Sequence, residues 1–242
     1  MRPPAQRAAL VTGASSGIGR AIALALAADG AALCLVGRNR ERLGECEREA
    51  RRLGAWAVAG VVADLADEAA LREAAAAARH FAQIDILVHA AAEHSHGPVE
   101  TAPAAALDRQ YRTNLRAPYL LTQLLLPALR ARGGDVVFVN STQGITAGPD
   151  VSQYAATKHG LAALADSLRA EVNASGVRVL TLHLGRTASA MQERIFAEEG
   201  RPYRPEKLMQ PADVAAMVMA ALRLPRRAEV MSLAMRPAEK SY

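Results

Sequence analysis

The chain has 242 residues, 51% of them hydrophobic and 22% charged, a globular composition that excludes a disordered chain. The net charge is +5, but arginines alternate with glutamates, as in RNRERLGECEREARR, and only 4% of residues are aromatic, so we expect no nucleic-acid partner. No apolar run is long enough to span a membrane or serve as a signal peptide, so we expect no membrane association and a cytoplasmic location.

Short apolar runs alternate with longer helical patterns along the whole chain. Predicted strands begin at Ala8 (AALVTG), Ala32 (ALCLVG), Ala55 (AWAVAGVVADL), Ile84 (IDILVHAAA), Gly134 (GDVVFVNST), Val177 (VRVLTLHLG) and Ala228 (AEVMSL). Predicted helices follow the first glycine turn and then span about 40–53, 67–81, 104–131, 152–175, 188–200 and 211–223. Strands that are apolar throughout are typical of parallel sheets with both faces covered. The sequence therefore predicts an α/β fold, with residues 1–242 forming one doubly wound, Rossmann-type parallel sheet of about seven strands.

Two segments carry candidate chemistry. TGASSGIG, with Gly13, Gly17 and Gly19, follows the first strand and opens a helix, a position that suits the binding of a pyrophosphate to free N–H groups. SQYAATKHG places Tyr154 and Lys158 four residues apart, on one face of a predicted helix. An ammonium group near a phenol favours the phenolate and lowers the phenol's pKa. Each segment alone also fits an ordinary turn or helix face.

The spacing of further residues resembles a known family. The glycine loop reads TGxxxGxG, Asn114 lies in YRTNLRAPY, and Ser141 precedes Tyr154 by 13 residues. In this order, these residues resemble the short-chain dehydrogenase/reductase family, in its classical branch, over about residues 7–233. The resemblance implies an NAD(P)(H)-dependent oxidoreductase that acts on a carbonyl or a secondary alcohol. An alternative is a catalytically silent relative that binds nucleotide and serves as a regulator or an assembly partner.

The resemblance also implies roles for the matching residues. Tyr154 would be the general acid or base, and Ser141 would hydrogen-bond the substrate oxygen. Lys158 would lower the pKa of Tyr154 and hold the nicotinamide ribose, and Asn114 would position a water through its backbone. The implied cofactor-binding residues are Gly13, Ser15, Ser16, Gly17, Ile18, Gly19, Arg38, Asp64, Leu65, Ala90, Tyr154, Lys158, Gly185 and Thr187.

The end of the second strand indicates which cofactor is preferred. NAD-binding relatives carry an acid there, and this chain has Gly37, followed by Arg38 and, nearby, Arg40. A guanidinium can bind a 2′-phosphate with two N–H groups. We therefore expect NADP(H) to be preferred over NAD(H).

The chain departs from the family pattern at two strand ends. The usual Asn-Asn-Ala-Gly is replaced by four residues from His89 to Ala92, and Leu184 replaces a proline before Gly185. Thr187 and Ser189 both remain candidates for the hydroxyl that meets the cofactor. The polar residues His89, Glu93, His94 and His96 have no metal-binding helix spacing, so we expect no metal there but loop polarity or substrate contact.

The remaining expectations concern a lid and an assembly. Residues 188–210 join a strand end to a helix, carry many charges and are punctuated by Gly200, Pro202 and Pro205, so they are expected to form a mobile lid over a small-molecule substrate. They carry no chemical signature that would identify this substrate. By family resemblance we expect a homodimer or homotetramer, with the helices near 104–131 and 152–175 at the interface.

Overall fold

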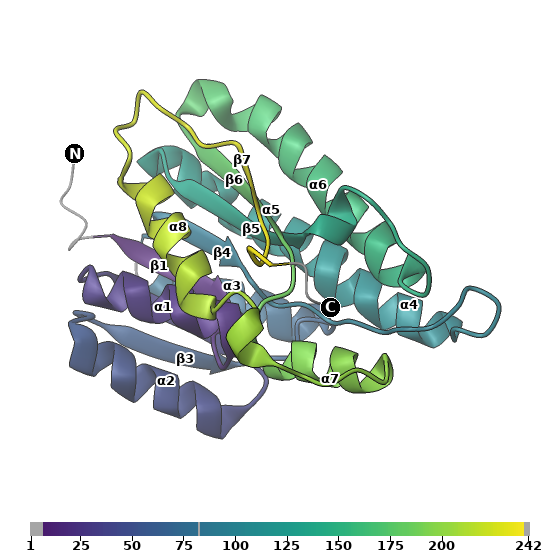
Figure 1. Ribbon diagram of the computed structural model, residues 1–242. Helices are drawn as coiled ribbons and strands as arrows, with labels where there is room; N and C mark the ends of the chain where they lie inside the picture. The colour runs from purple at the N-terminus through teal and green to yellow at the C-terminus, as the bar shows by residue number, and fades with distance from the viewer. Residues whose placement is uncertain (1–6, 82, 240–242) are drawn as a thin grey trace.

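The protein is described by a computed structural model, which covers residues 7–81 and 83–239. Within these residues, seven strands form one sheet in which every neighbouring pair is parallel. The strands are β1 (Ala8–Thr12), β2 (Ala32–Gly37), β3 (Val58–Val62), β4 (Ile86–His89), β5 (Asp135–Ser141), β6 (Arg178–Leu184) and β7 (Ser232–Met235). Their order is β3-β2-β1-β4-β5-β6-β7, so the predicted doubly wound sheet is confirmed (Figure 1).

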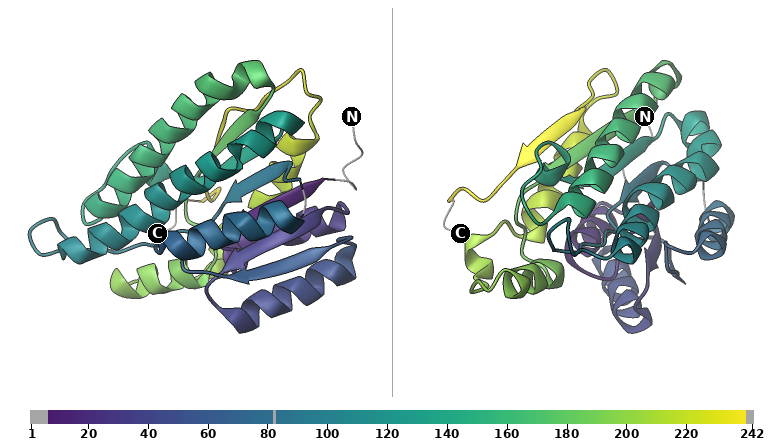
Figure 2. Two further views of the ribbon diagram at one scale, coloured as in Figure 1. Left: turned by 180° about the vertical axis from the view of Figure 1, so that it is seen from behind. Right: turned by 90° about the vertical axis from the view of Figure 1, so that its right-hand side faces the viewer.

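Helices cover both faces of the sheet (Figures 1 and 2). The α-helices are α1 (Gly17–Ala28), α2 (Arg40–Leu53), α3 (Glu68–Phe81), α4 (Ala104–Tyr111), α5 (Ala117–Arg132), α6 (Ser152–Val172), α7 (Ala190–Glu198) and α8 (Pro211–Arg223). Short helical turns are η2 (Arg112–Arg116), η3 (Thr142–Gly144), η4 (Asn173–Ser175) and η5 (Pro205–Lys207). In the described part of the chain, no helix is both long and apolar enough to cross a membrane.

Two hydrophobic cores lie on opposite faces of the sheet. One joins the strands to α1, α2 and α8, and the other joins them to α3, α5 and α6. All residues of β1 and β2 are buried, as expected for strands that are covered on both faces. This two-sided burial explains why β1 and β2 read as continuous apolar runs.

The predicted helix near 104–131 contains an irregular turn. It is observed as α4, the π-helical turn η2 and α5, and Asn114 lies in the π turn. A π turn inserts one residue into the helical ladder and is frequent at functional sites. The sequence predicted the length of this segment but not the π turn.

The last strand begins later than the sequence predicted. The run AEVMSL starts at Ala228, whereas β7 spans Ser232–Met235. The Glu229 side chain accepts a hydrogen bond from the backbone N–H of Val179 at 2.8 Å. A side chain thus satisfies a donor of β6, and strand pairing starts only beyond it, between Thr181 and Ser232.

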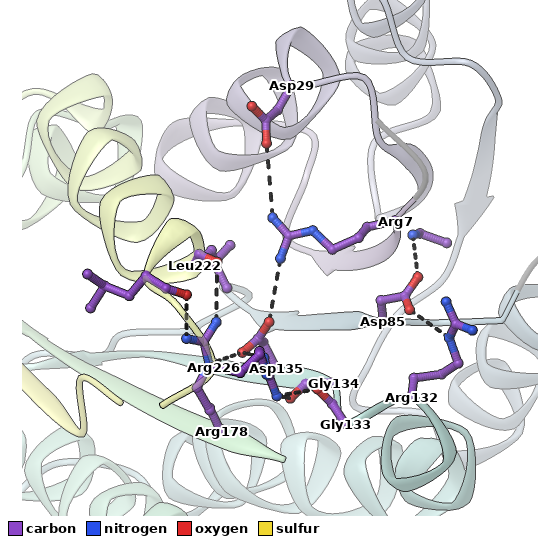
Figure 3. A network of polar contacts seen from close by, with 12 residues as sticks. Arg7, Asp29, Asp85, Arg132, Gly133, Gly134, Asp135, Arg178, Leu222 and Arg226 are labelled. Carbon is purple, nitrogen blue, oxygen red and sulfur yellow. Dashed lines mark hydrogen bonds and ion pairs between the residues drawn. The ribbon is translucent and has the colours of Figure 1, made fainter. Parts of the chain in front are cut away.

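A network of ion pairs lies at the amino-terminal ends of the strands (Figure 3). The Asp135 carboxylate, only 4% exposed, accepts hydrogen bonds from Arg178 Nε at 2.7 Å and Arg226 Nη1 at 2.9 Å. Asp85 accepts from the backbone N–H of Ala8 at 2.9 Å and from Arg132 Nε at 2.8 Å. The network therefore ties the segment after α8 to the starts of β1, β4, β5 and β6, at the edge opposite the carboxyl ends of the strands.

Candidate active site

A cleft of about 570 Å³ lies at the carboxyl ends of the strands. The order of the sheet reverses direction between β1 and β4, and ligands of doubly wound sheets bind at such a switch point. Of the predicted site residues, all but Asn114 line this cleft: Gly13, Ser15, Ser16, Gly17, Ile18, Gly19, Arg38, Asp64, Leu65, Ala90, Ser141, Tyr154, Lys158, Gly185 and Thr187.

Glycines shape the turn between β1 and α1. Gly13 has a φ of 68°, and a Cβ there would lie 2.8 Å from the backbone nitrogen of Ala91. A Cβ on Gly19 would lie 2.4 Å from the carbonyl oxygen of Gly13, so α1 packs directly on the turn. Ser16 is the N-cap residue, but its side chain makes no capping hydrogen bond. The first N–H groups of α1 are therefore left without a side-chain cap where the helix meets the cleft, which fits a bound pyrophosphate.

The side of the cleft beside β2 is basic. A Cβ on Gly37 would lie 3.1 Å from the Ser15 side chain, so this position has little room for the acid of NAD-binding relatives. Arg38 lines the cleft with a side chain that is 61% exposed, and its Nη1 donates to Glu93 Oε1 at 2.6 Å. The sequence did not indicate this ion pair, because its partners lie on different strand ends.

The second arginine on the β2 side of the cleft is Arg42, whereas the sequence had pointed to Arg40. The Asn39 side chain accepts a hydrogen bond from the backbone N–H of Arg42 at 2.9 Å and caps α2. This cap sets the start of the helix and therefore the face on which each arginine lies. Recognising Asn39 as the N-cap would have pointed to the correct residue.

Asp64 and Leu65 line the cleft after β3. Asp64 Oδ1 also accepts from the backbone N–H of Ala66 at 3.0 Å, so the carboxylate fixes its own turn. Its placement thus fits a turn cap as well as a neighbour of the cofactor.

The end of β4, where the sequence departs from the family pattern, is attached to β1 by Thr12. The Thr12 hydroxyl accepts from the backbone N–H groups of Ala90 at 3.1 Å and Ala91 at 3.2 Å, and it donates to the Val88 carbonyl at 3.2 Å. Thr12 thus joins β1 to β4 at the segment where the chain departs from the family pattern. Thr12 belongs to the TG dipeptide of the glycine loop, but its neighbours in the sequence do not indicate this contact with β4.

The polar residues near the end of β4 lie in two different surroundings: His89 is in the core, whereas His94 and His96 are stacked on each other, with ring centres 6.4 Å apart. His89 is 3% exposed, its Nε2 lies 2.9 Å from Thr122 Oγ1, and burial lowers its pKa to about 3. His94 instead lines the cleft, and its ring lies 4.8 Å from the ring of Tyr154. Burial lowers the pKa of His94 to about 4, so it is neutral at physiological pH. Among the described residues no group of His, Cys, Asp and Glu is arranged to hold a metal ion.

Ser141, Tyr154 and Lys158 meet where β5 faces α6. The Ser141 hydroxyl hydrogen-bonds the Tyr154 phenol. Lys158 Nζ lies 5.6 Å from the centre of the Tyr154 ring and donates to the Val139 carbonyl at 3.1 Å. The side chain of Asn140 joins these elements, because it accepts from Ser141 N at 2.8 Å and donates to Lys158 O at 3.1 Å.

The pKa of Tyr154 differs from the sequence-based expectation, and the pKa of Lys158 is shifted as well. Burial raises the pKa of Tyr154 to about 12, although the Ser141 hydrogen bond opposes the rise. Burial also lowers the pKa of Lys158 to about 8. The expected lowering of the phenol pKa by Lys158 is thus wrong for the protein alone, because desolvation of the buried phenol outweighs the effects that favour its charged form. At neutral pH, Tyr154 is a protonated phenol.

Asn114 lies behind the cleft. Its Oδ1 accepts from Glu93 N at 2.7 Å, and its Nδ2 donates to Glu93 O at 2.8 Å and to Thr157 Oγ1 at 3.1 Å. With the carboxamide engaged on both sides, Asn114 fixes the segment after β4 against α6. A role in a proton relay would fall to its backbone, as the family resemblance implies.

The last part of the cleft lies after β6. Leu184 continues the ladder by pairing with Met235, and Gly185 N donates to Met235 O at 2.7 Å. Ser189 caps α7, because its hydroxyl accepts from Gln192 N at 3.1 Å and donates to Thr187 O at 3.3 Å. The Thr187 hydroxyl donates to Gly185 O at 3.2 Å and keeps a lone pair for a further donor.

Comparison with known proteins gives a family and a set of solved relatives. The model of the short chain dehydrogenase family matches residues 7–200. Dehydrogenase/reductase SDR family member 7B from Bos taurus is 35% identical over 225 residues, covering 88% of this chain and 69% of that protein.

Solved structures resemble the chain over nearly its whole length. An alcohol dehydrogenase from the archaeon Thermococcus sibiricus, complexed with 5-hydroxy-NADP, has 27% identity and a TM-score of 0.87, covering 98% of this chain and 100% of that one. A short chain dehydrogenase from Burkholderia cenocepacia, in complex with NADP, has 29% identity and a TM-score of 0.82, covering 97% of this chain and 98% of that one.

Proposed function

The chain belongs to the short-chain dehydrogenase/reductase family, and from that membership we propose that it transfers a hydride between NADP(H) and a carbonyl or secondary alcohol substrate. One observation carries the proposal. Ser141, Tyr154 and Lys158 line the same cleft as the uncapped N-terminus of α1. A proton donor, its supporting cation and an anion site are thus combined in one place.

The cofactor would be held by residues that follow β1, β3 and β6, and by Lys158 of α6. The pyrophosphate fits the first N–H groups of α1 at Gly17, Ile18 and Gly19. Asp64 and Leu65 would lie beside the adenine. Lys158 would bind the nicotinamide ribose, and the acceptor lone pair of Thr187 suits the nicotinamide amide. When bound, the nicotinamide supplies or accepts the hydride.

The preference for NADP(H) rests on the charge of the β2 side. Arg38 and Arg42 both line the cleft there, and Gly37 contributes no carboxylate. Two of the solved relatives hold NADP or a derivative of it, and their likeness to this chain supports the same choice. A charge-assisted contact from Arg38 to the 2′-phosphate would contribute about 1.5–3 kcal/mol.

The side chains around the substrate oxygen have separate tasks. Ser141 and Tyr154 would both donate hydrogen bonds to it, and Tyr154 would pass its proton to the oxygen during reduction. The pKa of about 12 keeps the phenol protonated at neutral pH, which is the form that reduction needs. Lys158 would favour the resulting phenolate electrostatically, and the backbone of Asn114 would hold a water on the route to solvent.

Hydride transfer to a panel of carbonyls and alcohols, followed by the absorbance of the reduced nicotinamide, tests the proposal. Tyr154→Phe should lower turnover by about 10²–10⁴-fold and leave the Kd for NADP(H) within a few-fold, because the ring still packs. Near-normal turnover by Tyr154→Phe would show that this residue is not the proton donor. Cofactor binding without hydride transfer to any panel member would favour the catalytically silent alternative.

The same proposal includes a lid. Residues 188–210 contain α7, and the backbone pairing of Thr187 with Met209 closes the base of this segment. Arg194 Nη2 donates to the His94 carbonyl at 3.2 Å, the contact by which α7 meets the loop after β4. We propose that residues 188–210 open and close over the substrate, because they follow a strand end, carry many charges and contain Gly200, Pro202 and Pro205.

We further propose that residues 1–242 act as one domain and assemble as a homodimer or homotetramer through the helices near 104–131 and 152–175. Exposed apolar side chains on the first of these segments support this assembly: Leu107 is 39% exposed, Tyr111 47% and Tyr119 53%. Aromatic residues are enriched at the cores of protein interfaces.

A further inference from the structure

Glu93 is the acidic partner of the arginine to which the proposed function assigns the 2′-phosphate. Its Oε1 lies 2.6 Å from Arg38 Nη1, and no second acidic partner of Arg38 occurs among the described residues. Arg38 follows β2, Glu93 follows β4, and β1 lies between these two strands. The Arg38–Glu93 pair therefore crosses the carboxyl end of β1, where the glycine turn begins.

The backbone of Glu93 is held in place. Asn114 binds both its N–H at 2.7 Å and its carbonyl at 2.8 Å, and the preceding Ala90 and Ala91 are fixed by Thr12. The pair can therefore open by rotation of the Glu93 or Arg38 side chain while the main chain of Glu93 stays in place. A movement of the main chain would break four hydrogen bonds.

The pair itself can be opened by a ligand. The Arg38 side chain is 61% exposed and that of Glu93 24%, and ion pairs this open to solvent contribute little to stability. A 2′-phosphate carries more negative charge than a carboxylate and offers three acceptor oxygens to the same guanidinium. The two anions compete for one arginine, and they also repel each other when both are close to it.

On the premise of the proposed function, we propose that Glu93 weakens the preference of this protein for NADP(H) by opposing the binding of the 2′-phosphate at Arg38. The carboxylate holds Arg38 before the cofactor binds, and the 2′-phosphate must displace it. NAD(H) has no 2′-phosphate, so its binding does not meet this competition. Glu93 therefore reduces the difference in affinity between NADP(H) and NAD(H) that Arg38 produces.

Calorimetric titration with NADP⁺, NAD⁺ and adenosine 2′,5′-bisphosphate tests this proposal without a known substrate. Glu93→Gln keeps the size of the side chain and removes its charge. It should tighten the binding of NADP⁺ and of the bisphosphate by about fivefold, and leave NAD⁺ within about twofold. The gain should shrink at high ionic strength, because the charges are partly exposed.

Glu100→Gln is the matched control. Glu100 lies on the same loop, is exposed, and has no ion pair among the described contacts. Its neutralisation changes the net charge of the protein equally, so it should leave all three affinities unchanged. An equal gain from both substitutions would overturn the proposal, because the effect would then come from net charge alone.

Arg38→Ala separates this proposal from the proposed function. If Arg38→Ala weakens NADP⁺ but Glu93→Gln changes nothing, the role of Glu93 is refuted and that of Arg38 stands. If Arg38→Ala leaves NADP⁺ unaffected, the assignment of the 2′-phosphate to Arg38 fails. If Glu93→Gln instead weakens NAD⁺, the carboxylate grips the ribose hydroxyls and the competition is refuted. In the double variant, the gain from Glu93→Gln should be smaller than in the wild type, because Arg38 is no longer there to be released.

Discussion

Replacing Lys158 with methionine should make the protein more stable and inactive. The side chain is 2% exposed, and burial lowers its pKa from an ordinary 10.5 to about 8. The folded state therefore holds a charged group in a place that disfavours charge. Proteins retain such a loss of stability where function needs the buried charge. Lys158 has two proposed functions, which are to favour the phenolate of Tyr154 and to bind the nicotinamide ribose.

The size of the effect follows from the pKa difference. About 2.5 units at 1.36 kcal/mol per unit correspond to about 3 kcal/mol against the charged form. Methionine has a similar length and no charge, so it removes this cost. It also loses the hydrogen bond from Nζ to the Val139 carbonyl, worth about 1 kcal/mol. The net gain is about 2 kcal/mol, or about 4–8 °C in Tm for a chain of this size.

The stability that Lys158→Met gains over the wild type should decrease as the pH rises. Below pH 8, Lys158 is charged in the folded and the unfolded states, and the full cost is present. Between pH 8 and 10.5 the folded state releases its proton first, so the unfolded state binds more protons and wild-type stability rises with pH. The advantage of Lys158→Met is therefore largest below pH 8 and disappears towards pH 10.5.

Urea unfolding followed by circular dichroism at about pH 6.5 and about pH 9.5 measures this difference. Lys207→Met is the control: this lysine is exposed, so its removal should change stability by no more than about half a kcal/mol at either pH. If Lys158→Met is less stable than the wild type at the lower pH, or if its advantage is the same at both, the desolvation argument is refuted.

Three further predictions concern the edge of the sheet, the lid and the assembly. Asp135→Asn should reduce the free energy of unfolding by about 3–5 kcal/mol, because Arg178 and Arg226 lose their buried carboxylate. Urea unfolding measures this, and a loss below about 1 kcal/mol would contradict the importance of the network. Hydrogen exchange in residues 188–210 should slow when cofactor and substrate bind, and strong protection without ligand would reject a moving lid. Light scattering should give the mass of a dimer or tetramer, and a monomer mass would exclude the proposed interface.

The sequence by itself determined the fold class and most of the cleft. Strands of a sheet covered on both faces must be apolar throughout, so their positions were visible as short hydrophobic runs. Helical spacing placed Tyr154 and Lys158 on one face, and the glycine turn is dictated by backbone conformation at Gly13. Such features depend on neighbours along the chain, and a local pattern is enough to predict them.

Other features depended on contacts between segments distant in sequence. The cap at Asn39 decided that Arg42 rather than Arg40 lines the cleft, and the Thr12 hydroxyl joins β1 to β4. The Glu93–Arg38 pair joins residues 55 positions apart. No periodicity encodes such a pairing, because it arises from the order of strands in the sheet.

The chemistry of the catalytic pair was also decided by the tertiary structure. From the sequence, a lysine one turn from a tyrosine predicts a lowered phenol pKa, because the pair is judged by charge alone. The fold buries both side chains between β5 and α6, and the pKa values of Tyr154 and Lys158 shift towards the neutral forms, to about 12 and about 8. The sequence determines that the phenol and the ammonium group lie close together, whereas the tertiary packing determines how much water each group retains. For the pKa values of these two groups, the loss of water has a larger effect than the attraction between their charges.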